Sequence, residues 1–271
     1  MKKYLLVSFS LVLISMNVLA QLVAAKPVKK VAALSMPNES GNNGATVVWH
    51  PVLKKYYASY AGNAEYPMAV FDATYRLVSP EDITTMFDVR GMWYNTITKR
   101  LEANGFDENG WISYKLDTKG IPEDIVQLQD GQVQPDKQSL GVFDVLKKKI
   151  CFLSDNRILY YSLNGEALDE MIELKLKIAG DESMDDELEE DIELSDTYNL
   201  TALCYTGIPN AEFGILNYSL LQIEMYNRKG ELTKTLQLPD DTVVYNNFNF
   251  AYANSTWWLF DKNEKKWFGF K

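Results

Sequence analysis

The chain has 271 residues, of which 46% are hydrophobic and 13% aromatic, so its composition fits a folded protein with a sizeable core and excludes a wholly disordered one. Its net charge of −10 disfavours nucleic acid as a partner, because a field of that sign repels phosphate backbones. A single histidine, His50, excludes zinc sites that need two or three imidazoles.

Residues 1–20 have the three-part pattern of a secretory signal peptide. Lys2 and Lys3 precede an apolar stretch from Tyr4 to Met16, and a small-residue cleavage site follows directly before Gln21. The apolar stretch is shorter than the ~20 residues that a spanning helix needs, and no second such stretch follows. We therefore predict a bacterial protein that is exported to the periplasm or the exterior, with no integral membrane segment after signal cleavage.

From residue 45 onward, one hairpin pattern occurs five times. Each copy has an apolar or aromatic strand, a polar turn that often contains glycine, and a second strand. The copies are AVFDATYRLVS (69–79), ISYKLDTKGIPEDIVQL (112–128), LYYSLNGEALDEMIEL (159–174), IEMYNRKGELTKTLQL (223–238) and WWLFDKNEKKWFGF (257–270). An aromatic residue recurs at one place in each copy, namely Phe71, Tyr114, Tyr161, Tyr226 and Phe260. We interpret these five residues as packing anchors.

The hairpins predict an all-β fold. Further strand-like material, rich in aromatic and β-branched residues, precedes each hairpin, which gives about four strands in roughly 45 residues. A four-stranded antiparallel unit at this period is typical of a β-propeller blade, because radial stacking lets each small sheet bury both faces. We predict a β-propeller domain of five blades over residues 45–271, with a six-bladed ring or a β-sandwich as alternatives.

The segment 21–44 precedes the repeats. Its stretch KPVKKVAALSM (26–36) is a possible extra strand that closes the ring against the C-terminal blade. A six-bladed ring would need one more blade built from residues 22–45 and the short fifth repeat, and these offer too few residues.

At this level the chain resembles secreted bacterial β-propeller repeat proteins. The resemblance rests on VVWHPVLKKYYASYAGNAEYPMAVFDATYRLVS (47–79) and on the recurring hairpins, and it covers about residues 45–271. It is a resemblance of architecture, since the Trp-Asp ending of WD repeats is missing and no specific family is indicated. Propellers of this kind include binding modules, glycosidases and lactonase-like enzymes, so the resemblance implies a fold and leaves the function open.

The segment 180–196 is strongly acidic and contains no basic residue. We expect a solvated insertion between two blades, because like charges repel and resist packing. A calcium site is the alternative, and calcium is the one cofactor that the sequence suggests. Its ligands would be Asp185, Asp186, Glu189 and Glu190, although the EF-hand spacing is missing.

Two acidic residues are candidates for catalysis. A glycosidase needs two carboxyl groups roughly 5–10 Å apart, and Asp88 and Asp144 are expected on innermost strands around the central channel. His50 is the one histidine that a Ser-His-Asp arrangement could use, but no G-x-S-x-G motif accompanies it. We interpret His50 as a structural residue at a strand end.

Trp49, Trp93 and Tyr94 are candidates for ligand binding, since flat rings stack on the C–H faces of sugars. Packing between blades uses the same residue types at the same alternation. We predict a secreted binding or interaction module that holds a protein, a peptide or a glycan at the mouth of the central channel. The alternative is a carboxylate-dependent glycosidase or lyase that acts on a glycan in that channel.

The two cysteines, Cys151 and Cys204, leave two interpretations open. An oxidising compartment permits a disulfide between them. Both lie in apolar, strand-like stretches, where buried free thiols are equally natural.

Overall fold

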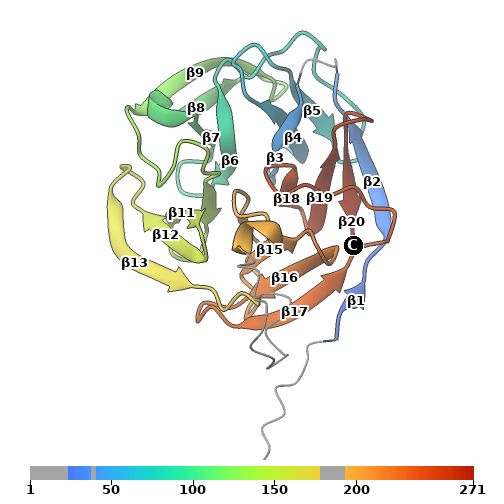
Figure 1. Ribbon diagram of the computed structural model, residues 1–271. Helices are drawn as coiled ribbons and strands as arrows, with labels where there is room; N and C mark the ends of the chain where they lie inside the picture. Colours follow the sequence, from blue (N-terminus) through green and yellow to red (C-terminus); the bar gives the residue numbers. More distant parts are fainter. Residues whose placement is uncertain (1–23, 38–40, 178–192) are drawn as a thin grey trace, which may run out of the picture.

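The computed structural model describes residues 24–37, 41–177 and 193–271. Five small, mainly antiparallel sheets stand around a central axis (Figure 1), which confirms the five-bladed β-propeller. The six-bladed ring and the β-sandwich are therefore wrong. The predicted signal peptide and the four proposed calcium ligands, Asp185, Asp186, Glu189 and Glu190, lie outside the described residues.

The blades follow one another along the chain. Blade 1 contains β3 (Asn43–His50), β4 (Lys55–Ala61) and β5 (Met68–Asp72). Blade 2 contains β6 (Val89–Asn95), β7 (Arg100–Gly105), β8 (Trp111–Leu116) and β9 (Pro122–Gln129), and blade 3 contains β10 (Val142–Asp144), β11 (Lys149–Ser154), β12 (Arg157–Tyr161) and β13 (Ala167–Glu173). Blade 4 contains β14 (Cys204–Tyr205), β15 (Phe213–Asn217), β16 (Gln222–Tyr226) and β17 (Leu232–Gln237), and blade 5 contains β18 (Phe250–Ala253), β19 (Thr256–Asp261) and β20 (Lys266–Phe270). Two short 3₁₀ turns, η1 (Asp107–Asn109) and η2 (Leu194–Asp196), are the helical elements among these residues.

The N-terminal segment completes the last two blades. Strand β2 (Lys30–Ser35) pairs antiparallel with β20, with Ala33 opposite Phe268, and becomes the outer strand of blade 5. Strand β1 (Lys26–Pro27) adds to β17 in parallel. The chain therefore supplies the outermost strands of blades 4 and 5 from its beginning, which covers edges that unpaired strands would leave open.

One detail of the predicted repeat is wrong. In blades 1 to 4 the recurring aromatic residue lies on the third strand, whereas Phe260 lies on β19, the second strand of blade 5. The hairpin 257–270 is therefore formed by the second and third strands of blade 5, and β2 supplies the fourth strand. Blade 1 also departs from the predicted four strands. Its sheet has three, and in place of a fourth strand Leu77 forms a single isolated bridge to Phe71.

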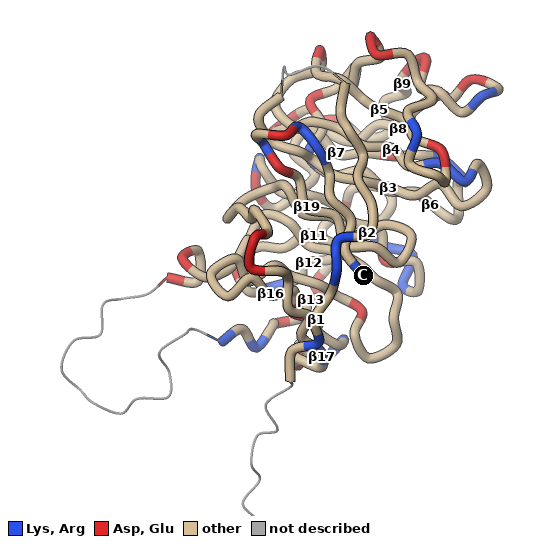
Figure 2. Tube along the Cα trace, turned by 90° about the vertical axis from the view of Figure 1, so that its right-hand side faces the viewer, with Lys and Arg blue, Asp and Glu red and all other residues tan. Residues whose placement is uncertain are grey.

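Packing between blades is dominated by aromatic residues. All five anchors, Phe71, Tyr114, Tyr161, Tyr226 and Phe260, are buried, as are Trp257 and Trp258. Both cysteines are buried free thiols, Cys151 on β11 and Cys204 on β14. No helix in the described part of the chain is long and apolar enough to cross a membrane. In a side view, many of the charged residues lie in the connections at the ends of the strands (Figure 2).

Candidate functional site: the mouth of the central channel

The five innermost strands, β3, β6, β10, β14 and β18, surround a central channel (Figure 1). One end of this channel opens into a cavity of about 870 Å³. The cavity takes in the C-terminal part of each innermost strand and the connection that follows it, so all five blades contribute to its wall. We call this end of the channel the mouth.

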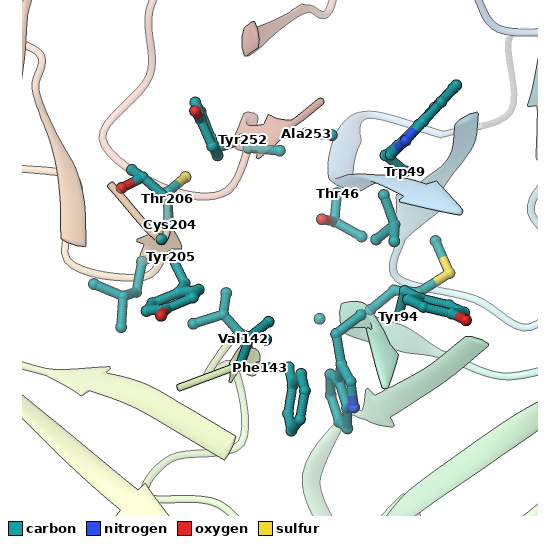
Figure 3. A pocket seen from close by; sticks show the side chains of 18 of the residues that line it. Thr46, Trp49, Tyr94, Val142, Phe143, Cys204, Tyr205, Thr206, Tyr252 and Ala253 are labelled. Atoms are coloured by element: carbon teal, nitrogen blue, oxygen red, sulfur yellow. The ribbon is translucent and has the colours of Figure 1, made fainter. Parts of the chain in front are cut away.

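The wall of the cavity is mainly apolar and aromatic (Figure 3). Four rings, Trp49, Tyr94, Tyr205 and Tyr252, line it and are half-buried. Aliphatic and small side chains fill the space between them, including Thr46, Val48, Val142 and Cys204. The lining residues with charged side chains are Lys148 and Glu212. Such a concave, mostly apolar cavity with few polar groups is typical of a binding site for a small or extended ligand.

A five-residue turn occurs five times and shapes this end of the molecule. Its first residue is buried, and the side chain of that residue accepts a backbone N–H from within the turn. His50 Nδ1 accepts from Leu53 N at 3.2 Å, and Asn95 Oδ1 accepts from Ile97 N at 2.9 Å. Asp144, Asn217 and Asp261 cap their turns in the same way. The fifth residue of each turn has a positive φ, and these residues are Lys54, Lys99, Lys148, Leu221 and Lys265.

Three of these turns surround the mouth. The turns 50–54, 95–99 and 144–148 directly follow the innermost strands β3, β6 and β10. The turns 217–221 and 261–265 follow second strands, which run antiparallel to the first, so they lie at the opposite end of the channel. We call the two groups the mouth turns and the far turns.

The tips of the mouth turns carry exposed apolar side chains. Val52 and Leu146 are each 72% exposed, and Ile97 and Val145 are each 47% exposed. Pro51, Val145 and Leu146 also line the cavity, so the exposed tips and the apolar cavity wall are continuous. Exposed apolar groups that gather around a concavity mark an interaction surface, whereas scattered ones need no explanation.

Each mouth turn ends in consecutive cations, in the sequences HPVLKK (50–55), NTITKR (95–100) and DVLKKK (144–149). Lys54, Lys99, Arg100 and Lys148 are exposed and form no ion pair with any described residue. The other cations have partners, since Lys147 and Lys149 both pair with Glu170, and Lys55 donates to the carbonyl of Lys119. We call Lys54, Lys99, Arg100 and Lys148 the mouth cations.

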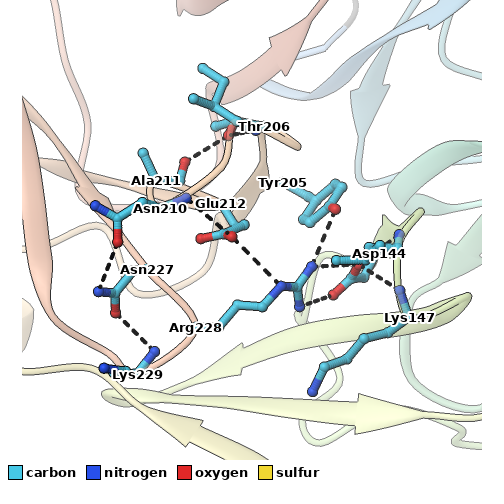
Figure 4. Close-up of polar contacts among 12 residues, drawn as sticks. Asp144, Lys147, Tyr205, Thr206, Asn210, Ala211, Glu212, Asn227, Arg228 and Lys229 are labelled. Atoms are coloured by element: carbon cyan, nitrogen blue, oxygen red, sulfur yellow. Dashed lines mark hydrogen bonds and ion pairs between the residues drawn. The ribbon is translucent and has the colours of Figure 1, made fainter.

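A buried ion pair fastens blade 3 to blade 4 beside the mouth (Figure 4). Arg228 donates from both terminal nitrogens to Asp144, at 2.6 Å to Oδ2 and 2.9 Å to Oδ1. The Asp144 side chain is fully buried and that of Arg228 is 21% exposed. Burial alone would raise the pKa of Asp144, but hydrogen bonds from Arg228 and from the backbone of Lys147 hold it below its usual range. The carboxylate is therefore a fixed, ionised structural group.

The same network includes Tyr205 and Glu212. Arg228 lies 3.3 Å from the Tyr205 hydroxyl, and its Nε lies 3.8 Å from Glu212 Oε1. Burial, together with the nearby Asp144 charge, raises the pKa of Tyr205 to about 12. Arg228 thus neutralises the acidic groups on the blade 4 side of the mouth, and the unpaired cations lie on blades 1 to 3.

The two predicted catalytic carboxylates do not converge. Asp88 precedes β6 and pairs with Arg90, whereas Asp144 ends β10. The backbones of β6 and β10 meet at Gly91 and Gly141, so Asp88 and Asp144 lie about three residues to either side of this contact. At a rise of about 3.3 Å per residue, this places them roughly 20 Å apart, at opposite ends of the channel. That separation is too long for the two-carboxylate chemistry of a glycosidase.

His50 caps the first mouth turn. Its ring lies 4.4 Å from the ring of Tyr94, and the residue is buried. Burial lowers the pKa of His50, so the ring is neutral at pH 7, as its role as an acceptor at Nδ1 requires. The environment of this side chain is that of a turn cap.

The three predicted ligand-binding aromatics all contribute to the channel wall. Trp49 and Tyr94 keep exposed surface in the cavity. Trp93 is buried, and its indole N–H donates to Glu102 at 3.0 Å. Trp93 also packs edge-on against Trp111 of β8, so its main contacts lie within the protein.

Sequence reasoning missed Tyr205, Tyr252, Arg228 and the mouth turns. The turns left a signal, since a polar cap, an apolar tip and paired cations recur in residues 50–55, 95–100 and 144–149. Among the residues that the structure describes, no group of three or more potential metal ligands lies close enough together to hold an ion.

Comparison with known proteins supports the architecture. No family model matches the chain, and no curated protein matches it. The crystal structure of the Myxococcus xanthus glutaminyl cyclase is similar, with a TM-score of 0.57 over 91% of this chain and 97% of that one, at 10% identity. A Bacteroides thetaiotaomicron protein of unknown function has a TM-score of 0.52 over 92% of this chain and 73% of that one, at 9% identity. At these identities the likeness shows the fold alone, and the chain is placed among β-propeller proteins of unassigned family.

Proposed function

We propose that the protein is an exported binding module that takes an apolar segment of a partner protein or peptide into the mouth of its central channel. The observation that carries this proposal is the continuity between the exposed tips of the mouth turns and the aromatic cavity beneath them. Val52, Ile97 and Leu146 come from the three turns that follow β3, β6 and β10, all three are exposed, and Leu146 itself lines the cavity.

The geometry favours a polypeptide over a glycan. The rings in the cavity could also stack on a glycan, but a glycan site presents many hydrogen-bonding groups as well, and here the turns at the rim expose aliphatic side chains such as Val52 and Leu146. The cavity wall offers few charged groups. Apolar side chains of a polypeptide fit such a surface, because their burial contributes roughly 25 cal/mol for each Å² removed from water.

The enzymatic alternative has less support. Asp88 and Asp144 lie at opposite ends of the channel, and Glu212 is the carboxylate among the lining residues. Hydrolysis or elimination with a pair of carboxylates would need a second acidic group that reaches the cavity beside Glu212. Asp144 shares Arg228 with Glu212, but it is fully buried, ion-paired and absent from the lining.

The experiment is a selection of phage-displayed random peptides on the immobilised protein. We expect enriched peptides that share an apolar or aromatic residue. Their binding should weaken about tenfold in Leu146→Ser, since burying one such side chain contributes about 1.5 kcal/mol or more. The matched control is Leu220→Ser, which removes a 49% exposed leucine from a far turn. Selection of no peptide, or equal loss in both variants, would contradict the proposal. A glycan array run in parallel tests the other ligand class.

Export is proposed on the pattern of residues 1–20. Expression of the full chain in a Gram-negative host should yield periplasmic protein whose mass corresponds to a start at Gln21. Protein that stays in the cytoplasm with an intact N-terminus would contradict export and would leave the binding proposal standing.

A further inference from the structure

We infer that the partner segment is acidic, with carboxylates on either side of the apolar residue that enters the channel. This inference rests on the proposed function and names the chemistry of its ligand. It starts from the mouth cations, Lys54, Lys99, Arg100 and Lys148, which belong to three blades and are exposed beside the apolar tips.

These cations run against the charge of the whole protein. The chain has a net charge of −10, yet each mouth turn together with the residue after it carries two or three consecutive basic residues, and the one acidic residue in these turns, Asp144, is buried against Arg228. At physiological ionic strength the screening length is about 8 Å, so a bound segment responds mainly to the charges within the mouth and little to the distant excess of acid.

The mouth cations form no ion pair with any residue that the structure describes. Lys147 and Lys149 both pair with Glu170, and Asp144 pairs with Arg228. The charges of these residues around the mouth are therefore neutralised within the protein. Lys54, Lys99, Arg100 and Lys148 are left over among the described residues. Carboxylates of a partner would form ion pairs with these four cations and fix the orientation of the segment over the cavity, since complementary charges set register and association rate.

The backbone of the mouth turns holds three of these lysines in a costly conformation. Lys54, Lys99 and Lys148 have φ values of 53°, 62° and 58°, in the left-handed region that glycine adopts without penalty. Lysine is held there at a conformational cost of about 1 kcal/mol. The far turn 261–265 has a lysine at the same position, but the ammonium of Lys265 donates to the carbonyl of Gly41, whereas the three mouth lysines form no ion pair with a described residue.

A polypeptide is favoured over an anionic membrane surface. Apolar tips with adjacent lysines also occur on proteins that bind lipid headgroups. The tips here, however, surround a cavity of about 870 Å³ lined by Trp49, Tyr94, Tyr205 and Tyr252, and a flat bilayer surface cannot fill it. A side chain projecting from an extended segment can.

The test uses the same peptide selection, read now for charge. We expect Asp and Glu to be enriched on both sides of the apolar residue relative to the input library. A peptide EEWLEE and its neutral counterpart QQWLQQ are then compared by fluorescence anisotropy, with the acidic peptide expected to bind about tenfold more tightly and to lose that advantage between about 0.05 and about 0.3 M salt.

Charge variants supply the decisive comparison. Replacing all four mouth cations by glutamine should weaken EEWLEE about tenfold and leave QQWLQQ unchanged. The matched control replaces Lys26, Lys137, Lys234 and Lys271, which are exposed and lie outside the mouth turns, and has the same net charge. Equal loss in both variants would overturn the inference, because it would reflect the overall field of the protein.

The remaining outcomes separate the two proposals. Enrichment of apolar peptides without acidic flanking residues would contradict the inference that the partner segment is acidic, and it would still support the proposed function. No enriched peptide, together with binding to phosphatidylglycerol vesicles that the four-glutamine variant loses, overturns both in favour of a membrane surface. Capture of neither peptides nor vesicles also overturns both.

Discussion

The mouth turns and the far turns use one backbone design at opposite ends of the channel. In both groups a buried cap residue accepts a backbone N–H, and the fifth residue has a positive φ. The groups differ in their surroundings, since the tips of the mouth turns border the cavity beside the mouth cations, whereas the exposed Leu220 of the far turn 217–221 does not line it. The far turn 261–265 instead has Lys265, whose ammonium donates to the carbonyl of Gly41 at 2.7 Å. The shared geometry is therefore structural, and the side chains added at the mouth are the functional part.

The caps themselves should control stability, and Asp144 should have the largest effect. Asp144→Asn keeps an oxygen for the N–H groups of Leu146 and Lys147 but leaves Arg228 without its carboxylate. Breaking such a buried pair should lower the free energy of unfolding by about 3 kcal/mol in urea titrations. The double variant with Arg228→Met should lose less than the sum of the two single variants, and strict additivity would show that the pair is not coupled.

At the mouth, the apolar tips should affect binding and leave stability unchanged. Val145→Ser combined with Leu146→Ser should keep the melting temperature within about 2 °C, because both side chains are exposed, and should weaken a selected peptide at least about tenfold. Unfolding of the variant, or normal binding by it, would contradict the claim that the turn backbone is structural and that the exposed side chains at the mouth bind the ligand. Leu220→Ser in a far turn serves as the control for both readouts.

His50 makes one mouth turn sensitive to pH. Burial lowers its pKa in the folded state, so below the unfolded value of about 6.5 the unfolded chain binds more protons and the free energy of unfolding falls. Denaturant titrations at about pH 7.5 and about pH 5.5 should show lower stability at the acidic value, since His50 is the only histidine.

The matched variant for this prediction is His50→Asn. Asparagine occupies the equivalent cap in the turns at Asn95 and Asn217, so the turn should be retained and the stability difference between the two pH values should disappear. A pH dependence that persists in the variant would place its origin elsewhere.

The smallest effect should come from the backbone of the mouth lysines. Lys99→Gly should raise the free energy of unfolding by about 0.5 kcal/mol, because glycine adopts φ of 62° without strain but has more freedom to lose on folding. Lys99→Gln removes the same charge without that gain. Both variants should weaken an acidic peptide equally, and a difference between them in binding would indicate that turn rigidity matters more than charge.

The architecture was predictable because it depends on short-range patterns. The five hairpins and their anchors predict the number of blades, and Phe71 and Phe260 are buried as packing residues should be. The position of Phe260 on the second strand of its blade, instead of the third, was not predictable. It results from the pairing of β2, from the other end of the chain, with β20. Pairing between the two ends of a sequence leaves no local pattern.

The site was harder to predict for a related reason. Asp144 was a candidate for catalysis because it is an acidic residue on an expected innermost strand. The partner that makes it a structural group, Arg228, lies 84 residues away in sequence. The residue at the cap position is His, Asn or Asp, so an alignment by residue type does not reveal the recurring turn. Only the structure shows that three of the five turns meet around one cavity.

The central claim is that the mouth turns, and not the far turns, contact the ligand. Amide hydrogen exchange measured with and without a selected peptide tests it within one molecule. Binding should slow exchange in residues 52–54, 96–99 and 145–148 and leave residues 218–221 and 262–265 unchanged. Protection confined to the far turns, or equal protection in both groups, would contradict the account.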